Sequence, residues 1–254
     1  MQENAELAKG IKAVIVLYSI VLSSYLIILL PQEVIKALTV EDGFIENAGA
    51  LSFFLASVLF FTAYGYSSGL KNQFGGFRTQ RNVFYFLLGI LFLICFGEEV
   101  SWGQRFFNWN TPGWLEAINL QGETNIHNIE VFHGSKRDGT PRTGFADMLQ
   151  MNRLFAIFWL IFCVVTPLAY KFSRRVREWC EWSGVPIVSL WIGALFIVHA
   201  VVFQLIWTVV TQTNPGIRFD INELKETNYA IIFLILAFWE LRKTILSRQE
   251  LGKQ

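Results

Sequence analysis

Two adjacent carboxylates stand at the end of an apolar run, within the sequence Cys95-Phe-Gly-Glu-Glu-Val-Ser-Trp-Gly-Gln-Arg105. Acidic side chains at a membrane boundary are costly unless they are paired or lie in water. One interpretation is functional: Glu98 is a general base, Glu99 ligates a metal, and Arg105 holds an anionic head group or developing negative charge. The alternative is that both acids mark the boundary and Glu98 pairs with Arg105. The candidate catalytic residues are Glu98, Ser101 and Arg105.

A second polar motif follows in Asn119-Leu-Gln-Gly-Glu-Thr-Asn-Ile-His-Asn128. In a helix, Glu123 and His127 would share a face, and in an extended segment they would point to the same side. Either geometry suits a shared metal or an imidazole oriented by a carboxylate. The alternative is a polar loop with an incidental histidine. The predicted ligands of zinc or another divalent metal are Glu99, Glu123, His127 and His133.

Other polar residues fall within or beside apolar runs. Glu46 either lines a site or caps the start of a helix. His199 lies in the middle of a run, where an ionisable residue suggests function, although a neutral histidine bonded between helices is the competing interpretation. Glu223 precedes another run and could be a solvated helix start, just as His133 could be a surface residue. The further candidate lining residues are Glu46, Asn47, Gln104, Asn125, Asn128, His199 and Glu223.

The elements that must position these residues are predicted membrane helices. The chain has 254 residues, of which 53% are hydrophobic and 16% charged, whereas soluble domains carry about a quarter charged residues. The apolar residues form runs near the length that crosses about 30 Å of hydrocarbon. The fold class is therefore an all-α polytopic membrane helix bundle. The predicted spans are 11–30, 44–66, 83–100, 154–170, 186–210 and 228–246.

Charge in the flanks predicts the orientation of these six spans. Most Lys and Arg residues fall on one side if both termini are cytoplasmic, as the positive-inside rule requires. The long connection (102–153) is then extracytoplasmic, and the candidate residues gather at the outer face of a bacterial cytoplasmic membrane. A net charge of +1 gives no reason to expect nucleic acid as a partner, so membrane lipids are the expected surroundings.

The motifs 97–105 and 121–128 resemble those of a group of bacterial multi-pass membrane proteins, with a weaker likeness at Glu41–Asn47. This resemblance implies no particular activity. A looser similarity, at Glu46-Asn47 and Ser101-Trp102, is to the membrane hydrolase superfamily of alkaline ceramidases and adiponectin receptors. It implies zinc held by histidines near a Ser and an Asp. That superfamily has seven spans and a His-x-x-x-His motif, whereas only His199 lies in a late span here.

The CAAX-type intramembrane proteases offer another comparison, because their signature also begins with paired glutamates. In that signature an Arg follows the second Glu by four residues, whereas Arg105 follows Glu99 by six. Neither mechanism is therefore transferred to this chain.

The sequence favours a membrane-embedded hydrolase or lipid-modifying enzyme, metal-dependent if the predicted ligands converge, with an amphipathic lipid substrate. Metal binding would lower the pKa of a bound water to about 7. One alternative is a non-catalytic scaffold or assembly factor. Another is a proton- or cation-coupled transporter, which requires polar residues along a complete pathway. The inner halves of most predicted spans carry few of them, apart from Glu240 and His199.

Overall fold

The computed structural model describes residues 14–40, 43–70, 80–134 and 136–251, except the side chains of Arg105 and Ala146. All regular elements in these ranges are helices, and the described residues contain no strand beyond an isolated bridge between Asn119 and Ile129. The predicted all-α class is confirmed.

Three helical stretches are long and apolar enough to cross a membrane: Gln32–Tyr66, Met151–Phe172 and Leu190–Thr213. They correspond to the predicted spans 44–66, 154–170 and 186–210. The last of these begins later than predicted, because residues 185–189 are not helical. The elements within these stretches are α2 (Gln32–Thr39), α3 (Phe44–Tyr66), α8 (Met151–Trp159), the π-helical turn η4 (Leu160–Val165), α9 (Thr166–Phe172) and α11 (Leu190–Thr213).

The other three predicted spans are also helical but differ in length. The first is a shorter apolar helix, Val14–Leu29, which ends in the 3-10 segment η1 (Ser24–Leu29), and residues 11–13 lie outside the described ranges. Helix α4 (Val83–Glu99) has 17 residues. Helix α12 (Arg218–Leu251) has 34 residues and begins well before the predicted 228–246.

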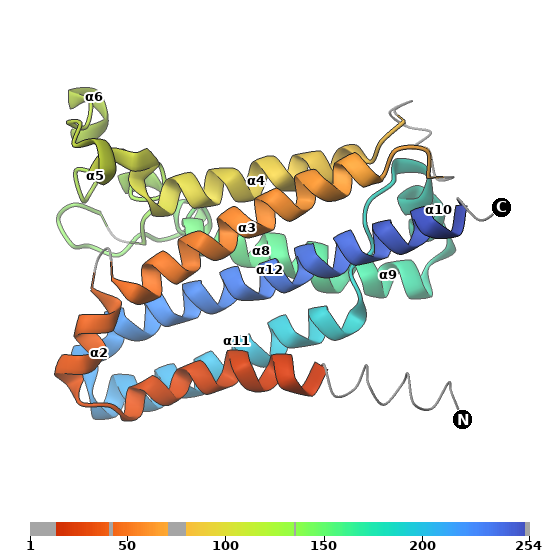
Figure 1. Ribbon diagram of the computed structural model, residues 1–254. Helices are drawn as coiled ribbons and strands as arrows, with labels where there is room; N and C mark the ends of the chain where they lie inside the picture. The colour runs from red at the N-terminus through yellow and green to blue at the C-terminus, as the bar shows by residue number, and fades with distance from the viewer. Residues whose placement is uncertain (1–13, 41–42, 71–79, 135, 252–254) are drawn as a thin grey trace.

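The helices lie side by side, with α3 packed most extensively against α12 and α4, and α11 packed against α12 (Figure 1). Phenylalanine rings fill the middle of this bundle. The ring centroids of Phe60 and Phe92 are 5.6 Å apart, and Phe233 lies 4.8 Å from both Phe92 and Phe196. All four side chains are fully buried. Stacked and tilted rings at these separations are favourable contacts in addition to their buried area, so the middle of the bundle is a dry aromatic core.

The two ends of the bundle carry different short elements (Figure 1). The amphipathic helix α10 (Arg174–Ser183), which the sequence analysis did not predict, lies at one end and exposes Trp179 and Trp182. The opposite end carries part of the long connection, including a one-turn helix within the segment 112–120, where the sequence predicts a short helix. The short elements of the opposite end are η2 (Ser101–Gly103), α5 (Gln104–Phe107), α6 (Gly113–Glu116), η3 (Glu130–Phe132), α7 (Phe145–Met148) and η5 (Pro215–Ile217).

Candidate functional site

A cavity of about 700 Å³ lies where the start of α3, the end of α4, the start of α12 and the long connection meet. We call it the acidic cavity. Segments far apart in the sequence contribute to it, so the tertiary packing brings together most of the residues that the sequence singled out. The sequence-predicted residues that line it are Glu46, Glu98, Glu99, Glu123, His127, Asn128, His133 and Glu223.

Glu98 is held by three hydrogen-bond donors. Its Oε2 accepts from the backbone N–H groups of Ile126, at 2.6 Å, and His127, at 2.9 Å. Its Oε1 accepts from the indole Nε1 of Trp102 at 2.7 Å. Hydrogen bonds to an ionised carboxylate are short and strong. The Glu98 side chain is therefore fixed in position and ties the long connection to the end of α4.

The imidazole of His127 lies against the same carboxylate. Its Nδ1 is 3.4 Å from Glu98 Oε2, and one third of the His127 side chain (33%) remains exposed. Burial alone would lower the pKa of His127, but the contact with Glu98 and the charges of Glu99 and Glu226 raise it above its ordinary value. A carboxylate at Nδ1 favours the tautomer with the proton on that nitrogen, which leaves Nε2 as an acceptor. Such an imidazole can act as a general base.

A left-handed turn, η2, positions these groups. Helix α4 ends at Glu99, and Ser101, Trp102 and Gly103 have φ values of +46°, +53° and +82°. The apolar run therefore does not continue as one helix through Trp102 to Arg105. Left-handed backbone costs roughly 1–2 kcal/mol for each residue other than glycine. The turn folds the Trp102 indole back onto Glu98.

Buried hydrogen bonds stabilise this strained turn. Ser101 is fully buried, and its Oγ donates to Glu123 Oε2 at 2.9 Å and accepts from Asn125 Nδ2 at 3.2 Å. Ser101 does not line the acidic cavity. Its position therefore supports a role in holding the second motif rather than direct contact with a substrate.

The second motif is a compact loop rather than a helix or a strand, and a buried asparagine organises it. Asn119 Oδ1 accepts from the backbone N–H groups of Gln121, at 2.9 Å, and Glu123, at 3.2 Å, while its Nδ2 donates to Asn125. The described hydrogen bonds of Glu123 go to Ser101 and Asn125. Glu98, and not the predicted Glu123, is the carboxylate recorded beside His127.

Further glutamates from three helices reach the acidic cavity. Glu46 comes from α3, Glu99 from α4, and Glu223 and Glu226 from α12. Glu226 accepts from Asn222 Nδ2 at 2.7 Å. Within the described part of the chain, Glu99 and Glu223 have no hydrogen-bond or ion-pair partner. This side of the cavity therefore concentrates carboxyl groups, of which Glu226 also lies 3.4 Å from Lys225 Nζ.

The remaining predicted residues lie elsewhere. His199 is fully buried in α11, where Tyr25 Oη is 2.8 Å from its Nε2 and the ring of Tyr229 lies edge-on at 4.5 Å. It is outside the acidic cavity, as the interpretation of a neutral histidine bonded between helices requires. Asn47 donates to the Gly43 carbonyl oxygen within its own helix.

Two further residues of the sequence analysis behave differently. Gln104 accepts from the backbone N–H of Thr124 at 2.6 Å and so supports the second motif. The side chain of Arg105 lies outside the described residues, as do Glu41 and Asp42, so the proposed Glu98–Arg105 pair stays a prediction.

The predicted metal ligands share the cavity but not a common centre. All four residues line it, yet no three His, Cys, Asp or Glu side chains within the described ranges lie close enough to hold one ion. The arrangement therefore favours acid–base chemistry by Glu98 and His127 more directly than metal ligation.

Sequence reasoning missed two residues that build the site. Trp102 is not among the residues that the sequence analysis proposes for the site, although it follows Glu98 by four residues. Asn119 was taken as part of a polar run, although asparagine is typical of turns whose backbone it bonds. In the structure both anchor the Glu98–His127 pair.

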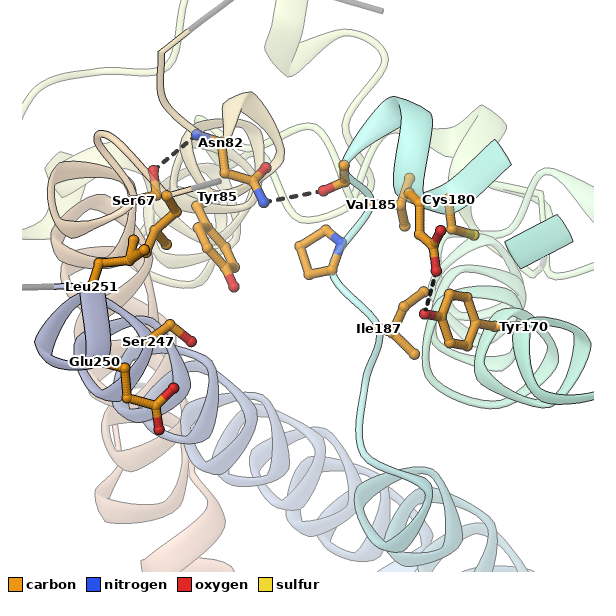
Figure 2. Close-up of a pocket in the computed structure, with 14 residues that line it drawn as sticks. Ser67, Asn82, Tyr85, Tyr170, Cys180, Val185, Ile187, Ser247, Glu250 and Leu251 are labelled. Atoms are coloured by element: carbon orange, nitrogen blue, oxygen red, sulfur yellow. Dashed lines mark hydrogen bonds between the residues drawn. The ribbon is translucent and has the colours of Figure 1, made fainter. Parts of the chain in front are cut away.

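A second cavity, of about 470 Å³, lies at the end of the bundle that carries α10 (Figure 2). Two hydrogen bonds join its walls: Asn82 donates to the Gly184 carbonyl oxygen at 3.0 Å, and Tyr170 donates to Glu181 at 3.0 Å. No histidine is among its described lining residues. These bonds tie α4, α9 and α10 together and do not resemble a catalytic arrangement.

Comparisons with protein-family models, with curated proteins and with solved structures found no match, so the function is argued from the geometry of the site.

Proposed function

We propose that this chain is a membrane-embedded hydrolase or other lipid-modifying enzyme that acts on an amphipathic substrate in the acidic cavity. The observation that carries the proposal is the contact between Glu98 and His127 at the wall of a cavity that has both polar and aromatic lining. A carboxylate-oriented imidazole beside a space large enough for a small ligand is a usual sign of general acid–base catalysis.

In the proposed reaction, Nε2 of His127 removes a proton from a water molecule as the water oxygen attacks an ester or amide carbonyl. Glu98 stabilises the imidazolium that forms. The bond from the carbonyl carbon to the leaving oxygen or nitrogen then breaks, and His127 returns the proton to the leaving group. A positioned base of this kind contributes roughly 10²–10⁴-fold to a rate.

The proposed setting is a six-span, bacterial cytoplasmic membrane protein with both termini inside and the acidic cavity at the outer face. The basic flank of α10, which includes Arg174 and Arg177, lies at the end opposite to α5 and α6 (Figure 1). Cytoplasmic flanks are enriched in Lys and Arg. This separation supports the orientation that the sequence predicts.

Transport is the less favoured alternative, because the two cavities have no lining residue in common among those described. Between them lie buried residues of the core that line neither cavity, including Phe60 and Phe233. A pathway for protons or cations needs polar groups or water along its length. The scaffold alternative makes no use of the Glu98–His127 pair.

The test is lipid turnover in nanodiscs made from a bacterial polar lipid extract, with the released fatty acids and lysolipids quantified by mass spectrometry. We expect products from the wild type and a loss of about 10²-fold or more with His127→Ala. Glu116→Gln is the control, since Glu116 is exposed on α6. Identical product profiles for wild type and His127→Ala, with both proteins folded, would favour the scaffold.

Elemental mass spectrometry of the same samples tests the metal-dependent form of the proposal. One zinc or other divalent ion per chain in the wild type, lost in both Glu99→Gln and His127→Ala, would assign the water activation to a metal. Turnover by protein without bound metal would assign it to His127 alone.

A further inference from the structure

The carboxyl groups that line the acidic cavity favour a ligand with a positive charge. Six glutamates line it, and no Lys or Arg is among its described lining residues. The donors described above satisfy Glu98, whereas Glu99 and Glu223 face the cavity without a described hydrogen-bond donor. Carboxylates in a site of low dielectric repel one another, and a cation relieves that repulsion.

The cavity also has an apolar end. Phe53 lies seven residues after Glu46 on α3, and Phe92 lies seven residues before Glu99 on α4. At a rise of about 1.5 Å per residue, each aromatic ring is about 10 Å along the helix from its glutamate. The rings of Phe53 and Phe92 stack at 6.0 Å, and Phe155 of α8 meets Phe53 at 6.4 Å. Phe155, which is partly exposed, and Phe53 form an aromatic floor below the carboxylates, and the fully buried ring of Phe92 supports this floor from the core.

One wall of the cavity is exposed on its outer side. Ile94 of α4 and Leu154 of α8 line the cavity, and they are 42% and 37% exposed. An amphiphile that enters between α4 and α8 would pass these apolar side chains and would bring its alkyl chain directly from the bilayer.

We infer that the acidic cavity binds a cationic amphiphile, a molecule with an ammonium group and an alkyl chain, and that a substrate also carries the ester or amide bond that is hydrolysed. The ammonium group lies between Glu99 and Glu223, and the alkyl chain lies against the aromatic floor. The inference deepens the proposed function by naming its substrate class, and its catalytic meaning rests on that function. Binding itself can be measured without turnover.

The experiment measures binding of three probes of equal chain length, dodecylamine, dodecanol and dodecanoate, to the full chain in dodecyl maltoside. Isothermal titration gives the dissociation constants, and tryptophan fluorescence gives the thermal midpoint. We expect dodecylamine to bind at least about tenfold more tightly than dodecanol, and dodecanoate to bind most weakly.

Matched variants distinguish recognition of the ammonium charge from recognition of the alkyl chain. We expect Glu99→Gln and Glu223→Gln each to weaken dodecylamine binding about tenfold and to leave dodecanol binding unchanged. Two variants are used so that the test survives if one of them fails to fold. Each substitution keeps the shape of the side chain and removes its charge. Glu116→Gln removes the same charge from an exposed site and should leave all three affinities unchanged.

Equal affinities for the amine and the alcohol would overturn the inference, as would stabilisation by Ca²⁺ or Zn²⁺ alone with none by dodecylamine. His127→Ala should abolish turnover and retain amine binding. If the amine binds but no lipid is turned over, the ligand class stands and the enzyme proposal fails. If a lipid without an amine is turned over and neither Glu99→Gln nor Glu223→Gln changes its rate, the enzyme stands and this inference fails.

Discussion

The contact between Glu98 and His127 makes the chemistry of a single residue depend on its neighbour. Trp102 and two backbone N–H groups hold the carboxylate, so the carboxylate can hold the imidazole. Burial lowers the pKa of His127, whereas the contact with Glu98, and with it the charges of Glu99 and Glu226, raises that pKa. The response of the site to pH therefore reports on the pair.

We expect turnover by the proposed enzyme to rise with pH through an apparent pKa above the ordinary histidine value of about 6.5. A general base must be neutral, and His127 loses its proton only above its raised pKa. Glu98→Gln removes the attraction for the proton and should move the apparent pKa of kcat/KM to lower pH. The measurement is a pH–rate profile of both proteins, with Glu116→Gln as the control.

The contribution of His127 to folding stability should fall as pH rises, whereas the turnover should increase. A raised pKa stabilises the folded state when His127 is protonated, so this contribution is complete below the unfolded pKa and is lost as pH rises through the folded pKa. Thermal midpoints should fall over that range in the wild type and much less in Glu98→Gln. If the apparent pKa of kcat/KM were the same in Glu98→Gln as in the wild type, the titrating group would not be His127.

At the scale of elements, the position of α8 depends on a close approach between helices. A Cβ at Gly193 of α11 would lie 2.3 Å from the carbonyl oxygen of Cys163, inside the π-helical turn η4. π-Helical turns within α-helices often occur at functional sites. Here η4 follows α8, which supplies Phe155 and Phe158 to the acidic cavity. The Gly193 contact therefore fixes one wall of the site.

Gly193→Ala should destabilise the protein by roughly 1–3 kcal/mol, because a methyl group cannot fit against a backbone carbonyl without a shift of one helix. Gly65→Ala is the matched control, since a Cβ there meets nothing within 4 Å. In a helix that substitution should be neutral or stabilising by up to about 1 kcal/mol. Unfolding midpoints in detergent, followed by tryptophan fluorescence, compare the two. Equal midpoints would contradict the close approach of α11 to η4.

For the whole molecule, the orientation in the membrane determines which side of the cell the acidic cavity faces. The end of the bundle with α5 and α6 lies opposite the end with α10 (Figure 1). The two ends can therefore be assigned to sides of the membrane by labelling one exposed residue at each.

We expect Asp138→Cys, in the long connection, to react with a membrane-impermeant maleimide in intact cells. Glu178→Cys, on α10, should react only after the cells are permeabilised, because α10 is predicted to be cytoplasmic. Both native side chains are exposed, and the unmodified chain, in which Cys163 and Cys180 are buried and Cys95 is partly buried, gives the background. The reverse pattern would place the acidic cavity at the cytoplasmic face, and labelling of both in intact cells would contradict a protein that crosses the membrane between them.

The sequence by itself determined the helical class and the residue types of the candidate site. A run of apolar residues predicts a helix without knowledge of the fold, because the backbone hydrogen bonds of a helix lie within its own segment. The length of the run then gives the approximate length of the helix. Paired glutamates next to an apolar run, and a histidine within a polar motif, likewise need no fold to be noticed. The boundaries of α3 were predicted from this local signal alone.

Only the tertiary structure decided which residues meet. The left-handed turn after Glu99 costs free energy locally and exists because Glu123 and Asn125, more than twenty residues away, bond to Ser101. That turn brings the carboxylate of Glu98 into contact with His127. Helix packing places His199 against Tyr25 rather than in the acidic cavity. Such contacts depend on groups distant in the chain, so no local period or spacing encodes them.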